Sequence, residues 1–215
     1  MSYSIGVDIG GTFTDIVLMA QSGAISTFKT LTTPDDFGRG IAAGVKGVLE
    51  SQGARASEVG RVIHATTVAT NAILEHKGAH TGLITTEGFR DVLEMRRLRI
   101  PEMYALNYPR PDPLVARRLR LEVTERLGAD GAVRVPLDEA SVRRAAERLA
   151  AERVEAIAVC LLHSYADPVH EKRVAAILRE ALGDEVFITC SSDILPVIRE
   201  YERTSTTVIN AFLGP

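Results

Sequence analysis

Two adjacent glycines interrupt an apolar run close to the start of the chain. Residues 5–18 read IGVDIGGTFTDIVL, so the pair falls between two aliphatic stretches. Glycine has no Cβ, which lets the backbone turn sharply and come close to another group. The β-branched and aliphatic residues after the turn indicate that the chain leaves it as a strand. This segment therefore predicts a β-hairpin whose tip holds Gly10 and Gly11.

Polar groups around this tip point to an anion site. The amides of three successive residues at such a turn face one concavity, which suits a phosphate. Threonine hydroxyls add donors, and a carboxylate at Asp8 suits a hydrated Mg²⁺ ion. We therefore treat Asp8 as the candidate metal-binding residue. The candidate cofactor-binding residues are Gly10, Gly11, Thr12, Phe13 and Thr14.

The glycine pair does not belong to either of two common phosphate-binding loops. A dinucleotide fingerprint needs G-x-G-x-x-G before a helix, and a Walker loop needs a terminal Gly-Lys-Ser or Gly-Lys-Thr. Neither pattern is present in residues 5–18. An ordinary glycine-rich hairpin remains an alternative, but it gains nothing from an aspartate and two threonines around its turn.

Length and composition limit the class of protein. The 215 residues are 46% hydrophobic and 25% charged, which is typical of a globular protein with a real core. The net charge of -3 argues against a general nucleic-acid surface. The two cysteines, Cys160 and Cys190, are too few for a disulfide scaffold, and Cys160 lies in an apolar run typical of a buried thiol. With no signal sequence or membrane-length apolar stretch, we expect a cytoplasmic protein that does not bind membranes.

The first 92 residues predict an α/β subdomain that binds phosphate. After the hairpin we expect a strand at 24–30, a helix from Thr33 to Gly53, a strand at 61–65, a helix from about Thr66 to Gly78, and a strand at 81–85. Three strands, a helix, a strand, a helix and a strand is the order of ribonuclease-H-like domains. Each half of an actin-like ATPase has this mixed-sheet fold.

The rest of the chain divides into three predicted segments. Residues 93–116 are expected to form a long loop rich in Arg and Pro, which is either functional or simply a solvated surface loop or docking arm. Residues 117–192 continue the α/β alternation, with a helix capped by Asp138 and a continuously apolar strand at 156–162. Residues 193–215 are expected to begin a following, truncated domain, because their apolar helix needs something further to pack against.

Four motifs in order resemble one family. They are GVDIGGTFTD at 6–15, HATTVATNA at 64–72, GFRD at 88–91 and EYERTSTTVINA at 200–211. Together they are similar to the N-terminal region of the hydantoinase A, 5-oxoprolinase and acetone carboxylase β-subunit family. One departure is visible, since the family usually has Gly after the motif histidine, where this chain has Ala65. The change leaves less room for a ligand near that backbone.

The resemblance implies ATP-dependent activation of an unreactive carbonyl. In such enzymes ATP phosphorylates the carbonyl oxygen of a cyclic amide or ketone, and the product is then hydrolysed or carboxylated. ATP and Mg²⁺ are the implied cofactors, and a B-type hydantoinase subunit or fused domain is the implied partner, with oligomers allowed. Because family members are several times longer, we expect this region alone to bind ATP weakly and not to turn over.

The resemblance also implies a catalytic role for Asp8, which would hold the hydrated Mg²⁺ ion or orient the nucleophile. It further implies a set of substrate-binding residues. They are His64, Thr66, Thr67, Asn71 and Arg90. The first four lie at a strand-to-helix junction, where helix-start amides suit a carbonyl or phosphate; plain helix capping beside a structural histidine is the alternative. Arg90 suits a carboxylate or phosphate, although a solvated arginine is an equal alternative.

Two other functions remain open. An actin-like kinase for a sugar or polyol hydroxyl would need a carboxylate base near the substrate, and residues 64–71 supply none. A non-catalytic module that kept the actin-like half-fold is the other alternative.

Overall fold

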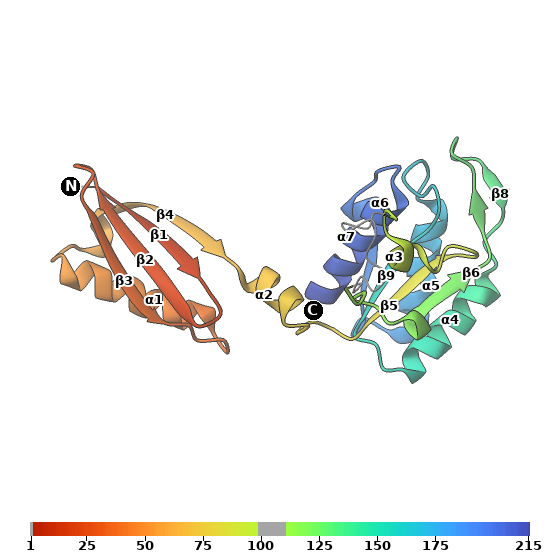
Figure 1. The fold of residues 1–215 in the computed structure, drawn as a ribbon, viewed down its shortest axis with the longest axis horizontal. Helices are drawn as coiled ribbons and strands as arrows, with labels where there is room; N and C mark the ends of the chain where they lie inside the picture. Colours follow the sequence, from red (N-terminus) through yellow and green to blue (C-terminus); the bar gives the residue numbers. More distant parts are fainter. Residues whose placement is uncertain (1, 99–110) are drawn as a thin grey trace, which may run out of the picture. The chain divides into compact units, whose positions relative to one another are not determined.

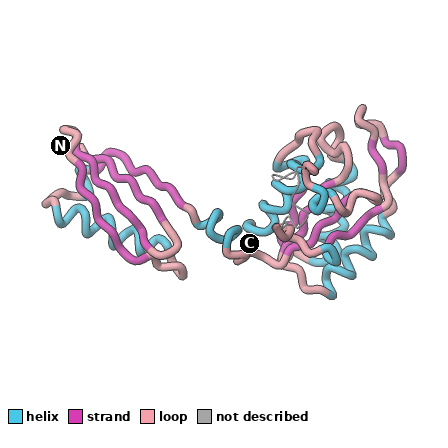
Figure 2. The backbone as a smooth tube through the Cα atoms, in the orientation of Figure 1, coloured by secondary structure: helices cyan, strands magenta, loops and turns pink. Residues whose placement is uncertain are grey.

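The structure is a computed structural model that describes residues 2–98 and 111–215. Its contacts divide the chain into two compact units, Met1–Lys77 and Gly78–Pro215, each built on its own sheet. Figure 1 labels the elements of each unit, and Figure 2 distinguishes their helices from their strands. No helix within the described residues is both long enough and apolar enough to cross a membrane.

The first unit is a mixed four-stranded sheet with helices. Its elements are β1 (Tyr3–Ile9), β2 (Phe13–Ala20), β3 (Ile25–Leu31), α1 (Phe37–Ser51), the 3₁₀ turn η1 (Ala56–Glu58), β4 (Val59–Thr66) and α2 (Val68–Leu74). The strand order is β3-β2-β1-β4. β1 runs antiparallel to β2 and parallel to β4, so the predicted hairpin at the start of the chain is confirmed.

The core of this unit lies between the sheet and α1. Alternate residues of β1, namely Ile5, Val7 and Ile9, are buried, because successive side chains of a strand point to opposite faces. α1 lies close to the sheet at Gly44, where an added Cβ would stand 2.2 Å from the Cδ1 atom of Ile16. Glycine at this position therefore permits the close approach.

Helix α1 begins later than the sequence pattern predicts. Its N-cap is Asp36, whose side chain accepts a hydrogen bond from the Arg39 amide, so the expected helix start at Thr33 is wrong. The Thr33 hydroxyl instead accepts from the Gly40 amide at 3.0 Å, one turn further into the helix. Asp36 has an extended backbone with φ of -161°, which suits an N-cap residue.

The second unit is built on a parallel sheet with the strand order β10-β9-β5-β6. The sheet strands are β5 (Thr81–Thr86), β6 (Arg120–Val123), β9 (Ala156–Cys160) and β10 (Phe187–Cys190), and a small hairpin adds β7 (Arg126–Leu127) and β8 (Val133–Val135). The helices are α3 (Val92–Met95), η2 (Arg117–Leu119), α4 (Glu139–Ala151), α5 (Val169–Leu182), α6 (Ser191–Ile194) and α7 (Glu200–Leu213).

Helices lie on both sides of this sheet. α4 and α5 pack together on one side, and α7 packs on β9 from the other (Figure 1). Every residue of β9 is buried, as its continuously apolar sequence predicts. The predicted cap of α4 is also confirmed, because the Asp138 carboxylate accepts from the Ala140 amide at 2.9 Å.

The observed units differ from the segments expected from the sequence. The boundary expected after residue 92 lies at 77/78, because β5 pairs with β6 and β9 and joins the second sheet. Residues 193–215 do not stand apart, since Val208 and Ala211 of α7 belong to the buried core of the second unit. Of the long segment at 93–116, residues 99–110 lie outside the described part of the chain.

Candidate functional site

The tip of the β1–β2 hairpin offers two free amides. The Gly10 amide is used within the turn, because it donates to the Phe13 carbonyl oxygen at 2.9 Å. Gly11 and Thr12 are exposed, and no hydrogen bond within the described residues uses either amide. A Cβ on Gly10 would lie 3.0 Å from the Phe13 oxygen, which explains glycine there. The expected concavity therefore has two available amides where three were predicted.

Two hydroxyls support the tip from inside the unit. The Thr32 hydroxyl donates to the Gly10 carbonyl oxygen at 2.9 Å and lies 3.1 Å from the Thr14 hydroxyl. A hydroxyl has one proton, and that of Thr32 is donated to the Gly10 carbonyl oxygen. In the hydrogen bond between the two hydroxyls, Thr14 is therefore the donor and Thr32 the acceptor. Thr14 is only 1% exposed, so its hydroxyl holds the turn and does not face a ligand, unlike the expectation for this residue.

The start of α2 lies against the same tip. The Thr67 amide donates to the Ile9 carbonyl oxygen at 3.1 Å, and the Asn71 side-chain amide donates to the Thr67 hydroxyl at 3.4 Å. A Cβ on Gly11 would stand 3.2 Å from the Asn71 amide nitrogen, so Asn71 borders the free amides. The Thr66 hydroxyl accepts from the Val68 amide at 3.1 Å, while the N-cap residue of α2 is Thr67, whose side chain makes no capping hydrogen bond.

Asp8 and His64 point to opposite faces of the sheet. In the strand register Val7 is opposite His64, while Asp8 is opposite Ala65 on one side and Asp15 on the other. The alternation of side chains along a strand therefore brings Asp8 beside Asp15 and away from His64.

The carboxylate of Asp8 is exposed and has no hydrogen bond or ion pair with a described residue, whereas Asp15 is paired with Lys29 at 3.1 Å. A hydrated Mg²⁺ ion is usually held by one or two carboxylates together with phosphate oxygens, and Asp8 fits that role. Within residues 2–98 and 111–215 no three His, Cys, Asp or Glu side chains gather as a metal site of their own.

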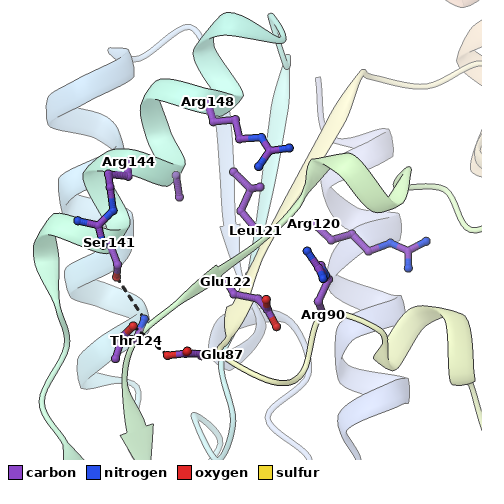
Figure 3. Close-up of a pocket in the computed structure, with 10 residues that line it drawn as sticks. Glu87, Arg90, Arg120, Leu121, Glu122, Thr124, Ser141, Arg144 and Arg148 are labelled. Atoms are coloured by element: carbon purple, nitrogen blue, oxygen red, sulfur yellow. Dashed lines mark hydrogen bonds between the residues drawn. The ribbon is translucent and has the colours of Figure 1, made fainter.

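Arg90 belongs to the second unit, in the turn after β5. It is half-buried, and its Nε atom is buried without a hydrogen-bond partner among the described residues. It lines a cavity beside α4 (Figure 3), so the alternative of a fully solvated arginine does not hold.

Arg203, in the motif at 200–211, is 1% exposed, so the motif charges do more than form a solvated, salt-bridged helix start. Its guanidinium donates to the carbonyl oxygens of Leu161 at 2.8 Å and Val197 at 3.1 Å. The residue therefore ties the end of β9 to the start of α7.

The sequence analysis did not identify a glutamate that the structure shows to be buried and to connect three elements. Glu171 of α5 is fully buried and accepts from the Leu161 amide at 2.9 Å, the Ser191 hydroxyl at 2.6 Å and the Ser192 amide at 2.9 Å. It stands in the charged run His170–Arg173, which resembles a solvated helix face in the sequence. Only the three-dimensional convergence of β9, α5 and α6 shows that it connects these elements.

Both cysteines are buried free thiols, as expected for Cys160. Burial raises the pKa of the Cys160 thiol, and it raises the pKa of Cys190 to about 12. Both thiols are therefore protonated near neutral pH, which argues against a nucleophilic role.

Known proteins resemble this chain along nearly its whole length. Residues 4–182 match the model of the hydantoinase/oxoprolinase N-terminal region. The chain is 38% identical over 219 residues to caprolactamase subunit alpha of Pseudomonas jessenii, with 99% of this chain and 31% of the relative covered.

Two solved structures are similar along nearly the whole chain. The crystal structure of ATP-dependent caprolactamase from Pseudomonas jessenii matches with a TM-score of 0.85 and 38% identity, over 99% of this chain and 32% of that one. The second is a nucleotide-free structure of acetone carboxylase, described with the mechanism of ATP-dependent acetone carboxylation. It matches with a TM-score of 0.89 and 31% identity, over 99% of this chain and 32% of that one. The chain thus spans about a third of the length of these relatives. On this evidence the chain belongs to the hydantoinase/oxoprolinase family and corresponds to its N-terminal region.

Proposed function

We propose that the first unit binds the phosphates of ATP at the hairpin tip. The support is the pair of exposed amides at Gly11 and Thr12, which no described residue occupies. Together with the Thr12 hydroxyl, they form a donor set suited to a phosphate oxygen. Thr14 and Thr32 position the turn from behind, and Phe13 contributes the carbonyl that fixes the Gly10 amide.

Asp8 is the proposed residue for hydrated Mg²⁺. Its exposed carboxylate lies in the strand that leads directly into the tip, so it can take a water of an ion bound to the phosphates. When bound, the ion offsets the charge of the triphosphate during phosphoryl transfer.

The proposed reaction of the longer protein is the opening of a cyclic amide. The amide oxygen attacks the γ-phosphorus of ATP, and ADP leaves with the electrons of the broken P–O bond. Water then adds to the activated carbon, the ring C–N bond breaks with protonation of the nitrogen, and a second water hydrolyses the acyl phosphate. The products are an amino acid, ADP and phosphate. The similarity to ATP-dependent caprolactamase supports this class of reaction.

Within this chain we propose that Thr67 and Asn71 contact the substrate carbonyl or the transferred phosphate. Both border the hairpin tip in the same unit. Thr66 holds the start of α2, and His64 remains a candidate substrate contact from the other face of the sheet.

We propose that the first unit is the ribonuclease-H-like half of an actin-like ATPase. Its mixed sheet, in the order β3-β2-β1-β4 with α1 packed on one face, supports that assignment. The caprolactamase relative is an alpha subunit, which supports a partner chain or fused domain for this protein as well.

The test is phosphate release by the complete protein with its partner subunit, with hydantoins, 5-oxoproline, acetone and sugars supplied in turn. The proposal expects ATP hydrolysis that depends on a cyclic amide and yields its ring-opened product in equal amount. Release stimulated by a sugar alone would replace this function with that of a sugar kinase. No stimulation by any substrate would favour the non-catalytic alternative.

A further inference from the structure

The second unit contains a charged cavity of about 330 Å³ between β6, α4 and the turn after β5 (Figure 3). This volume lies at the lower end of the range of small-molecule sites, which starts at roughly 300 Å³. The cavity runs along β6 from Arg120 to Thr124, the residue after the strand, and is also lined by Glu87 directly after β5. Hereafter it is called the α4 cavity.

Two of the four arginines that line the α4 cavity are already neutralised. Arg120 is paired with Glu94 at 2.8 Å, and Arg144 is paired with Asp138 at 3.3 Å. In Figure 3 the guanidinium of Arg120 points toward one side and that of Arg144 toward the other, away from the space between them. These two residues form its walls.

The other two arginines are not held by close ion pairs, although the charge of Arg90 contributes to lowering the pKa of its neighbour Asp91. Arg148 of α4 and Arg90 have no ion pair within the part of the chain that the structure describes. The buried Nε atom of Arg90 also has no hydrogen-bond partner there. A buried donor on a charged group is costly to leave unpaired, so the site is suited to an acceptor supplied by a ligand.

Each of the two glutamates that line the α4 cavity has only one carboxylate oxygen in a hydrogen bond with a described residue. One oxygen of Glu122 accepts from the Gly88 amide at 2.9 Å, and one oxygen of Glu87 accepts from the Thr124 hydroxyl at 3.0 Å. The second oxygen of each has no hydrogen bond or ion pair among the described residues. Both donors are neutral, and neither glutamate forms an ion pair with a described residue.

We propose that the α4 cavity binds a small amino acid. Its carboxylate lies between the guanidinium groups of Arg90 and Arg148, and its ammonium group takes the free oxygens of Glu122 and Glu87. Two unpaired cations and two unpaired anions leave the cavity neutral but dipolar, which matches a zwitterion better than a simple anion. Figure 3 shows Arg148 toward one end of the cavity and Glu87 toward the other.

The site is argued from this geometry and does not depend on ATP binding at the hairpin. Opening a cyclic amide does create a carboxylate and an amine in one molecule. The proposed reaction therefore yields a product of the chemical class that the α4 cavity recognises.

The test is calorimetric titration of the 215-residue chain, without ATP, with 5-aminopentanoate, pentanoate and pentylamine. We expect 5-aminopentanoate to bind at least about tenfold more tightly than either compound that lacks one charged group. Equal binding of pentanoate and 5-aminopentanoate would overturn the proposal in favour of a plain anion site. Absence of binding by all three would also overturn it.

Variants locate the binding. Arg148→Gln and Glu122→Gln should each weaken 5-aminopentanoate binding at least about tenfold. Arg143→Gln, on the same helix but outside the α4 cavity and paired with Glu139, should change it less than about twofold. In the unmodified chain, amide NMR shifts induced by the ligand should centre on Thr124 and Arg148, which keeps the test decisive if a variant misfolds. Shifts centred elsewhere would contradict the assignment.

Discussion

The hydroxyl of Thr32 donates to the carbonyl oxygen of Gly10 at 2.9 Å, across 22 residues of chain. The same hydroxyl accepts from Thr14, and the Thr32 amide donates to the Thr12 carbonyl at 3.0 Å. These bonds join the segment after β3 to both sides of the hairpin tip. They fix the direction in which the neighbouring free amides point.

Thr32→Val should loosen this turn with little change in side-chain volume. The Gly10 carbonyl and the Thr14 hydroxyl each lose a partner, so we expect the free energy of unfolding to fall by about 1–2 kcal/mol. ATP affinity should fall as well, because the tip is no longer held. Thr27→Val, at an exposed position of β3, is the matched control and should change stability by less than about 0.5 kcal/mol. Urea unfolding of both variants distinguishes them; equal stabilities would refute the role given to Thr32.

Asp8→Asn should separate Mg²⁺-dependent from Mg²⁺-independent nucleotide binding. We expect at least about tenfold weaker affinity for Mg–ATP, equivalent to about 1.4 kcal/mol. Affinity for ATP in the presence of a chelator should change little. Asp35→Asn, an exposed residue paired with Arg39, serves as the control. If Asp8→Asn binds Mg–ATP normally, the metal role of this residue is wrong.

Replacing Glu171 should destabilise the second unit strongly. In Glu171→Leu the buried amide of Leu161 and the partly buried amide of Ser192 lose their acceptor, so we expect a loss of about 2–5 kcal/mol. Glu180→Leu, exposed on the same helix, should cost less than about 0.5 kcal/mol. The comparison is made by chemical denaturation, and similar losses for the two variants would argue against a structural role for Glu171.

The buried thiols should make stability depend on alkaline pH. Burial raises the pKa of Cys190 from 9.0 to about 12, so the folded state holds this proton more tightly than the unfolded state. The resulting stabilisation is fully present below about pH 9 and is lost as the pH rises toward 12. At pH 8 a thiol with this pKa is ionised to only ~0.01%. Neither cysteine should then react with a disulfide reagent until denaturant is added; rapid reaction of the native chain would contradict this burial.

The sequence predicted most local elements but not how they group into sheets. The glycine pair and the apolar alternation of β1 and β2 indicated the hairpin, because short-range backbone chemistry determines it. The membership of β5 in the second sheet could not be predicted, since nothing in the sequence of Thr81–Thr86 favours one sheet over the other. That choice depends on pairing with β9, which lies some 75 residues further along the chain.

For the candidate site too, the sequence indicated the local segment but not the contacts within it. The types of the tip residues indicated a phosphate site. Which of these residues holds the turn and which is exposed depends on the hydrogen bonds that each one makes, and the sequence does not show them. Thr12 and Thr14 look equivalent in the sequence, yet Thr14 is buried and Thr12 is exposed. Thr32 was missed because it is distant in the chain, although the run Thr30-Leu31-Thr32-Thr33 was a visible signal.

The central claim is that the Gly11 and Thr12 amides receive the phosphates of ATP, and amide NMR tests it most directly. The chain is titrated with Mg²⁺ and a non-hydrolysable ATP analogue into the millimolar range, since binding by this region alone is expected to be weak. We predict the largest amide chemical-shift changes at Gly11 and Thr12 and no change at Gly23. The Gly23 amide, in the turn between β2 and β3, donates a hydrogen bond to the Ala20 carbonyl oxygen at 2.9 Å. Unchanged Gly11 and Thr12 resonances, or shifts confined to the second unit, would contradict the account.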